Sequence, residues 1–162
     1  MPVADETGSS FAENARQKAL HYAAFTGMTT LAEDSGFEVD ALNGEPGIYS
    51  ARYLGEHATY DERFADIYRR VRESGTPDRS ARFVCALAVA RGTDVIFETA
   101  ATVEGRLADA PAGPNGFGYD PVFYYPPYDR TFGEVSDQEK TAVSHRGQAM
   151  RAFRDYFFKP EP

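Results

Sequence analysis

Three stretches of the chain place apolar residues at helical spacing, and each begins with a capping signal. Ser10 and Glu13 have the spacing of a capping box, and the helix that they predict ends at Gly27. The inward face of this helix is expected to hold Phe11, Ala15, Ala19, Tyr22 and Ala23. The residues before Phe11 show no periodicity, so they predict a loop that leads into the helix.

Two further helices are predicted in the same way. Thr59 and Glu62 form a second capping box, ahead of a helix that ends at Gly75. Its inward face is expected to hold Phe64, Ile67, Tyr68 and Val71. A third capping box opens a terminal helical stretch over residues 136–157, in which residues 144–147 allow a bend.

The segments between the helices predict strands. Residues 29–44 are typical of two short strands around an acidic bend, so Glu33 and Asp34 are expected at a strand end. Residues 81–107 predict a hairpin with one buried strand. Residues 108–121 are rich in Gly and Pro and predict a loop, which leads to a short aromatic strand. Helices and strands alternate, but the hairpin interrupts a regular βαβ order. The expected fold class is therefore α/β with a mixed central sheet flanked by helices, or α+β.

Composition and charge exclude several classes of protein. The 162 residues suit a single domain, 1–162, with one core, and 42% of them are hydrophobic. The formal net charge is −8, without a basic stripe or a polybasic run. This balance argues against a nucleic-acid partner and against a membrane surface. An anionic ligand would need a cation beside it.

Cysteine content and hydropathy indicate the cellular location that we expect for the chain. The single cysteine, Cys85, excludes an internal disulfide framework and a cysteine-rich zinc site. No apolar run approaches the roughly 18 residues that span a bilayer, and the N-terminus lacks the features of a secretory signal. The expected location is the cytoplasm.

An acidic pair is the first candidate for chemistry. Glu33 and Asp34 are followed by Ser35 and Gly36, where two carboxylates could coordinate one Mg²⁺ and the glycine could admit a phosphate close to the backbone. Acids beside turns more often serve only as solvated or capping groups, so that alternative stays open.

Lysine use is a second signal. The chain has 14 arginines and only three lysines, Lys18, Lys140 and Lys159. A retained lysine can indicate that a compact ammonium is required, as in phosphate binding. The alternative is that the lysine was retained by chance.

Two further segments carry candidate binding groups. His145 and Arg146 place an imidazole beside an obligate cation, or simply mark a partly exposed helix terminus. Residues 117–120 combine an aromatic ring, a tight backbone and one acid, which suits a base-stacking pocket or a core-filling aromatic turn. Cys85 lies in an apolar strand and is predicted to be a core residue.

Four blocks of the sequence resemble the inosine triphosphate pyrophosphatase family in the family's own order: FAENARQKA, LAEDSGFEVDALNGEPGIYSARY, GFGYDPVF and EKTAVSHRGQAM. The resemblance runs from about Asp5 to Phe157. It implies hydrolysis of non-standard purine nucleoside triphosphates, such as ITP, dITP and XTP, to the nucleoside monophosphate and pyrophosphate. It also implies an elongated α/β fold with a long mixed sheet, a cleft between two lobes, and a homodimer.

The resemblance assigns roles to individual residues. Glu6, Glu33 and Asp34 match carboxylates that hold Mg²⁺, and Asp34 also matches the base that activates water. Glu33 departs from the commoner Asp but remains a carboxylate. His145 and Arg146 match a pair near the six-position of the purine, where donors suit the six-oxo acceptor and disfavour the amino group of adenine. The residues expected to bind substrate are Lys18, Ser35, Phe117, Gly118, Tyr119, Asp120, Lys140, His145 and Arg146.

One departure from the family concerns the front of the chain. Family members carry a strand and a glycine-containing loop with a Thr/Ser-x-Asn-x-x-Lys motif before the residue that matches Glu6, and this sequence starts after them. The start is interpreted as internal or misassigned, as trimmed, or as a natural absence. A nucleotide-binding remnant without turnover is therefore one alternative to an active enzyme. A pyrophosphatase for modified pyrimidine nucleotides is another, which the SHR block argues against.

Overall fold

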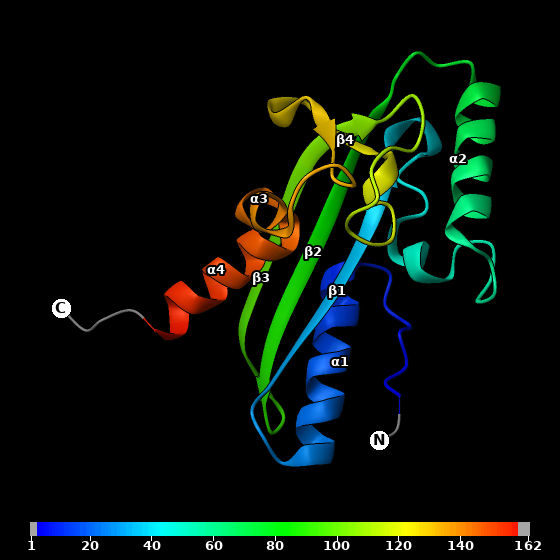
Figure 1. Cartoon of the computed structure of the whole chain (residues 1–162). Coiled ribbons are helices and arrows are strands. Elements are labelled where there is room, and N and C mark those ends of the chain that lie inside the picture. The colour runs from blue at the N-terminus through cyan, green and yellow to red at the C-terminus, as the bar shows by residue number, and fades with distance from the viewer. Residues whose placement is uncertain (1–2, 159–162) are drawn as a thin grey trace. The chain divides into compact units, whose positions relative to one another are not determined.

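The computed structural model describes residues 3–158. Its helices are α1 (Phe11–Thr26), α2 (Tyr60–Ser74), α3 (Asp137–Val143) and α4 (His145–Phe157). Its strands are β1 (Thr30–Val39), β2 (Ser80–Arg91), β3 (Asp94–Leu107), β4 (Phe123–Tyr125) and β5 (Arg130–Thr131) (Figure 1). The strands form a sheet in the order β1-β2-β3-β4-β5, and β4 pairs antiparallel with both β3 and β5. The predicted α/β fold class is confirmed.

The chain forms two compact units, and each is described by itself. Unit 1 comprises Met1–Ser35, Val84–Thr102 and His145–Pro162. Unit 2 comprises Gly36–Phe83 and Val103–Ser144. Strands β1, β2 and β3 each contribute residues to both units. The sequence predicts one core, whereas the described residues form a buried cluster in each unit.

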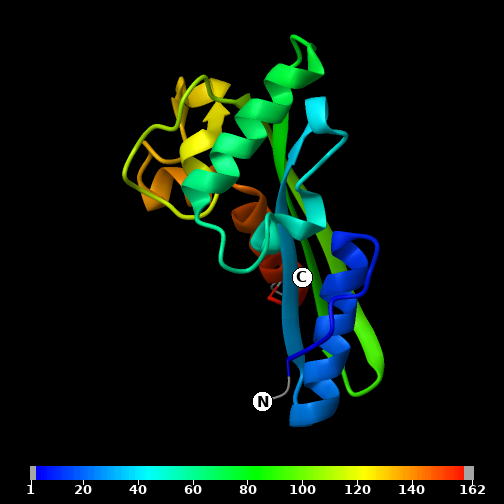
Figure 2. The same cartoon turned by 90° about the vertical axis from the view of Figure 1, so that its right-hand side faces the viewer.

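In unit 1, β2 is buried on both of its faces. The β2 residues that pack with Ala149 of α4 are Cys85, Leu87 and Val89. The alternate residues, whose side chains point to the other face, are also buried: Ala86, Ala88 and Ala90. Figure 2 shows α1 in front of the strands and α4 behind them. Burial on both faces is the reason that this stretch of the sequence is apolar throughout.

In unit 2, aromatic rings from separate strands form the centre of the core. Phe123 lies at the middle, with ring centroids 4.9 Å from Phe83 and 4.8 Å from Phe132. Phe37 of β1 is 5.1 Å from Phe83 and stacks on Tyr119 at 5.1 Å. Helix α2 adds buried side chains to the same cluster, namely Phe64, Ile67 and Val71. These are three of the four residues predicted for its inward face.

The predicted capping boxes are present at α2 and α3, where the side chains at both ends of each box make their expected bonds. At α1 the box is incomplete. Ser10 accepts the backbone N–H of Glu13 at 3.2 Å, but the Glu13 carboxylate accepts from the N–H of Ser9 at 2.7 Å, not from Ser10. Tyr22, predicted to face inward, is only half-buried. The terminal helix breaks at Ser144, whose extended backbone separates α3 from α4.

One prediction about the strands is wrong. Residues 30–39 form one continuous strand, so Glu33 and Asp34 lie within β1 and not at a bend or a strand end. Polar residues are tolerated there because each acid has charged partners on a neighbouring helix, as the next subsection describes. Residues 108–119 form a loop, as predicted. Strands β2 and β3 are neighbours in the sheet, which agrees with the predicted hairpin. Among the described residues, no helix is both long and apolar enough to cross a membrane.

Candidate functional site

Lys18 is the centre of a charged cluster in unit 1. Its Nζ donates to Glu6 Oε1 at 2.8 Å and to Asp34 Oδ1 at 2.7 Å. Lys18 lies on α1, Asp34 lies on β1, and Glu6 lies in the segment that precedes α1. The two carboxylates therefore converge on one cation, and Asp34 is only 8% exposed.

Asn14 completes this cluster, and the sequence analysis missed it. Its Nδ2 donates to Asp34 Oδ2 at 3.2 Å, and its Oδ1 accepts the backbone N–H of Gly8 at 2.8 Å. A Cβ at residue 8 would lie 2.7 Å from that oxygen, so the close approach requires glycine. Asn14 is fully buried on the inward face of α1. An amide among apolar inward-facing positions is the signal that could have identified it.

The charges of the cluster shift its pKa values. Burial alone would lower the pKa of Lys18, but bonds and attraction to Asp34 and Glu6 outweigh burial and raise it. Burial raises the pKa of Asp34, and repulsion from Glu6 adds to this effect, against the opposing effects of Lys18 and Asn14. The two carboxylates thus share the Lys18 ammonium.

Glu33 has different partners from Asp34. Consecutive strand residues point to opposite faces of a sheet. Glu33 pairs with Arg146 at the start of α4, through Nε to Oε2 at 2.8 Å and Nη2 to Oε1 at 2.5 Å. Glu33 Oε2 also accepts from the hydroxyl of Ser35 at 3.1 Å and from Cys85 Sγ at 3.2 Å.

These partners set the ionisation of the Glu33 group. Burial would raise the pKa of Glu33, but the Arg146 guanidinium, with Cys85 and Ser35, outweighs burial and lowers it. Burial, together with the Glu33 charge, raises the pKa of Cys85 to about 12, so this residue remains a thiol and acts as a donor. The prediction that Cys85 is a buried core residue is confirmed.

Another predicted residue of unit 1, His145, is adjacent in sequence to Arg146. His145 begins α4 and is buried, and Ser144 before it is also buried. Unit 1 therefore contains Glu6, Lys18, Glu33, Asp34, Ser35, His145 and Arg146. No three His, Cys, Asp or Glu side chains in residues 3–158 are grouped as a metal site. Of the three predicted metal ligands, Glu6 and Asp34 share Lys18, and Glu33 does not join them.

In unit 2, Asp120 organises the predicted base-binding loop. Its Oδ2 accepts the backbone N–H of Phe117 at 2.7 Å and the ammonium of Lys140 at 2.5 Å. That ammonium lies 4.1 Å from the centroid of the Phe117 ring. Asp120 is 2% exposed, whereas Phe117 is 61% exposed. The buried acid thus fixes an ammonium beneath an accessible aromatic ring.

The glycines and Tyr119 give this loop its shape. Gly116 has a φ of +75°, and a Cβ there would lie 2.2 Å from Asp120 Oδ2, so the turn around the carboxylate requires glycine. Gly118 also has a positive φ, of +63°. Tyr119 is buried, stacks on Phe37 and donates its hydroxyl to the Ser50 carbonyl at 2.9 Å. Its side chain therefore belongs to the core, which is the alternative interpretation of this turn.

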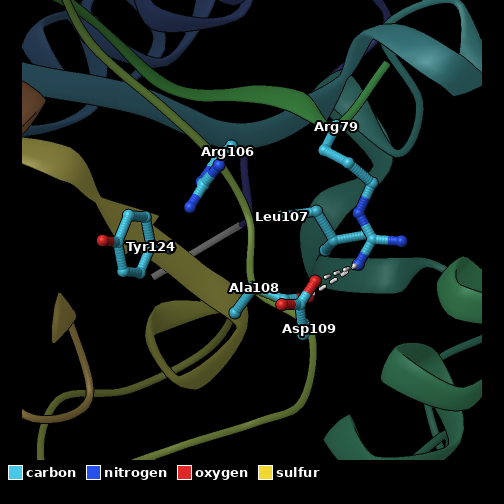
Figure 3. Close-up of a pocket in the computed structure, with 6 residues that line it drawn as sticks. All are labelled: Arg79, Arg106, Leu107, Ala108, Asp109 and Tyr124. Carbon is cyan, nitrogen blue, oxygen red and sulfur yellow. Dashed lines mark hydrogen bonds and ion pairs between the residues drawn. The ribbon is translucent and has the colours of Figure 1, made fainter. Parts of the chain in front are cut away.

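A pocket of about 110 Å³ in unit 2 has none of the predicted site residues in its lining (Figure 3). Its lining residues are Arg79, Arg106, Leu107, Ala108, Asp109 and Tyr124. Arg79 donates to the Ala108 carbonyl at 2.9 Å and lies 3.6 Å from Asp109. Arg106 lies over the Tyr124 ring at 4.6 Å. Both arginines already have protein partners, so this pocket is not assigned to the site.

Comparison with known proteins gives a consistent result. The model of the Ham1 family matches residues 1–156. A dITP/XTP pyrophosphatase from an Exiguobacterium species is 46% identical over 150 residues, which cover 93% of this chain and 76% of the relative. A dITP/XTP pyrophosphatase from Coxiella burnetii is 44% identical over 155 residues, with the same two coverages.

Solved structures agree with these relatives. A HAM1 protein from Coxiella burnetii has a TM-score of 0.94 and 42% identity, and the match covers 98% of this chain and 82% of that one. The Staphylococcus aureus Ham1 protein has a TM-score of 0.88 and 40% identity, with coverages of 96% and 80%.

Proposed function

This chain belongs to the Ham1 family, and on that premise we propose that it hydrolyses non-standard purine nucleoside triphosphates, namely ITP, dITP and XTP. The products are the nucleoside monophosphate and pyrophosphate, so the enzyme removes these nucleotides from the pool. Relatives named dITP/XTP pyrophosphatase, 44–46% identical over 93% of the chain, support the substrate class. The observation that carries the proposal is the convergence of Glu6 and Asp34 on the Lys18 ammonium.

Mg²⁺ is part of this proposal. Glu6 and Asp34 each place an oxygen within 2.8 Å of Lys18 Nζ, so the two carboxylates lie close enough together to contact one metal ion beside the ammonium. Mg²⁺ is commonly held by one or two carboxylates together with substrate phosphates, so this pair of residues fits it. When bound, the metal would neutralise phosphate charge and fix the phosphate oxygens relative to Asp34.

The residues of unit 1 account for the chemical step. Asp34 accepts a proton from the attacking water, and its raised pKa makes it a stronger base than an ordinary aspartate. The water oxygen bonds to the α-phosphorus, and the bond from the α-phosphorus to the bridging oxygen breaks, so that pyrophosphate leaves. Lys18 neutralises charge that develops on the phosphates.

Other residues select the base. Arg146 can only donate hydrogen bonds, and His145 can donate from at least one nitrogen, so both suit the six-oxo group of hypoxanthine or xanthine. Adenine presents an amino group at that position and would leave a donor facing a donor. A desolvated donor without an acceptor costs about 1–3 kcal/mol, which gives about 10- to 100-fold discrimination for each contact.

The product distinguishes this reaction from other triphosphate hydrolysis. We expect ITP, dITP and XTP to yield pyrophosphate in the presence of Mg²⁺, with no turnover in excess chelator. The assay uses a preparation free of inorganic pyrophosphatase. Release of orthophosphate alone would mean attack at the γ-phosphorus, and would contradict the proposal. Binding of ITP without turnover would identify the chain as a nucleotide-binding remnant.

A prediction concerns the exposed ring of unit 2. Phe117→Ala is expected to weaken all purine substrates alike, by a stacking contribution of roughly 1–3 kcal/mol. Loss of the ring leaves the bond between Lys140 and Asp120 in place, so folding is expected to be unaffected. The measurement is KM and kcat for ITP, XTP and ATP, with Phe25→Ala as the control because Phe25 is similarly exposed, at 56% against 61%, and lies on α1. A selective loss for one base would contradict stacking.

Self-association and location complete the proposal. We propose a homodimer in the cytoplasm, where the nucleotide pool is used. An apolar groove of about 300 Å³ in unit 1 supports a homodimer, because Leu31, Phe153 and Phe157 line it. Light scattering in solution tests this part, and a monomeric mass would contradict it.

A further inference from the structure

Arg146 is held by a carboxylate that the proposed reaction does not use. Glu33 accepts hydrogen bonds from Nε and Nη2 of the guanidinium, in a bidentate pair at 2.8 Å and 2.5 Å. Ser35 and Cys85 both donate to Glu33 Oε2, so the carboxylate is itself held by β1 and β2. Two strands of unit 1, β1 and β2, therefore set the orientation of one arginine of α4.

The position of Glu33 in β1 separates it from Asp34. Because neighbouring side chains of a strand point to opposite faces, Asp34 meets Lys18 of α1 whereas Glu33 meets Arg146 of α4. A carboxylate committed to Arg146, Ser35 and Cys85 is poorly placed to act as a metal ligand beside Asp34. Its contacts are those of a carboxylate that holds a guanidinium in place.

We propose that Glu33 is a positioning residue for base selection, which orients the Arg146 guanidinium so that an N–H group of it meets the six-oxo acceptor of the purine. This inference rests on the proposed function. The guanidinium is planar and carries five N–H donors in a rigid fork. Glu33 binds the edge formed by Nε and Nη2, which directs the opposite edge, with Nη1, in a defined direction. An acceptor on the base can then be read by a donor whose direction is already fixed.

The pair is a weak candidate for a purely stabilising role. The side chains of Glu33 and Arg146 are 32% and 41% exposed, and ion pairs at such exposure contribute little to stability. Arg16 and Glu98, at 45% and 41% exposure, form a similar bidentate pair in the same unit, at 2.8 Å and 3.2 Å. Glu98 has no place in the proposed reaction. Glu98→Gln is therefore a matched control for the loss of one such pair.

The test compares Glu33→Gln, Glu33→Asp and Glu98→Gln with the unchanged chain. The readouts are kcat/KM for ITP and for ATP, the Mg²⁺ concentration at half-maximal rate, equilibrium binding of ITP and ATP without metal, and the melting temperature. In Glu33→Gln the carboxamide accepts at one atom only, so Arg146 loses its fixed orientation. We expect the ratio of kcat/KM for ITP to that for ATP to fall by roughly tenfold. Glu33→Asp keeps the carboxylate, so its ratio is expected to lie between those of Glu33→Gln and the unchanged chain. Glu98→Gln is expected to leave the ratio unchanged.

The other outcomes of this test can be told apart. An unchanged ratio in Glu33→Gln, with a raised Mg²⁺ requirement, would make Glu33 a metal ligand. Equal losses for ITP and ATP, together with a lower melting temperature, would make its role structural. If the unchanged chain hydrolyses no ITP, the proposed function fails and equilibrium binding decides. A preference for ITP that Glu33→Gln removes would still support the inference, and no preference in the unchanged chain would overturn it.

Discussion

Asp34→Asn is expected to lower the rate of pyrophosphate release from ITP by about 10³-fold, because the substituted amide cannot take the proton from the attacking water. The fold is expected to survive. Asp34 is buried and its pKa is raised, so its ionised form is less favourable in the folded chain than in water. A neutral isostere removes that cost and can still accept from Lys18, which offsets the loss of the bond from Asn14. The measurement is kcat, with the melting temperature as the check on folding.

Asp94→Asn is the control for the loss of one negative charge. Asp94 is exposed at the start of β3 and lies in the same unit, away from the charged cluster. Asp94→Asn is expected to leave both the rate of pyrophosphate release and the melting temperature unchanged. Near-normal turnover in Asp34→Asn would remove this residue from the chemical step, and the assignment of the base with it.

Lys18→Met is expected to lower the rate of pyrophosphate release by about 10²- to 10³-fold, which is the typical effect of removing one well-placed electrostatic group. Methionine keeps the unbranched shape of the side chain but leaves Glu6 and Asp34 without their shared ammonium. We therefore expect a lower melting temperature as well. Lys18→Met differs in this respect from Asp34→Asn, which is expected to keep the stability of the chain.

Arg16→Gln is the matched control for Lys18→Met. Arg16 is a cation on the same helix, and its partner is Glu98, outside the cluster. Its loss removes one positive charge and one ion pair, and is expected to leave kcat unchanged. If Arg16→Gln and Lys18→Met slow the reaction equally, the effect of Lys18 comes from net charge and not from its position.

Local signals in the sequence predicted most helix boundaries. The capping boxes at Thr59 and Ser136 act within one turn, so tertiary context was not needed to identify them. At Ser10 the same spacing was only partly informative, because Ser9 competes for the Glu13 carboxylate. A motif of neighbouring residues is predictable where no other donor lies equally close.

The scarcity of lysine identified two of the residues that the structure places against buried acids. Lys18 contacts Asp34, and Lys140 contacts Asp120. Asn14, by contrast, was not predicted, because its partner Asp34 is distant along the chain. The separate environments of Gly118 and Tyr119, one in a turn and one in the core, also depend on packing that no local pattern encodes.

By itself, the sequence determined the helices, the buried strand β2, the glycine-rich loop and the residue types available for a phosphate and base site. These depend on periodicity, capping and composition, which act over short distances. Only the tertiary structure decided that β1 is continuous, and therefore that Glu33 and Asp34 face different helices. Alternation along a strand sends adjacent side chains to opposite faces, so two acids that the sequence presents as a pair have separate partners.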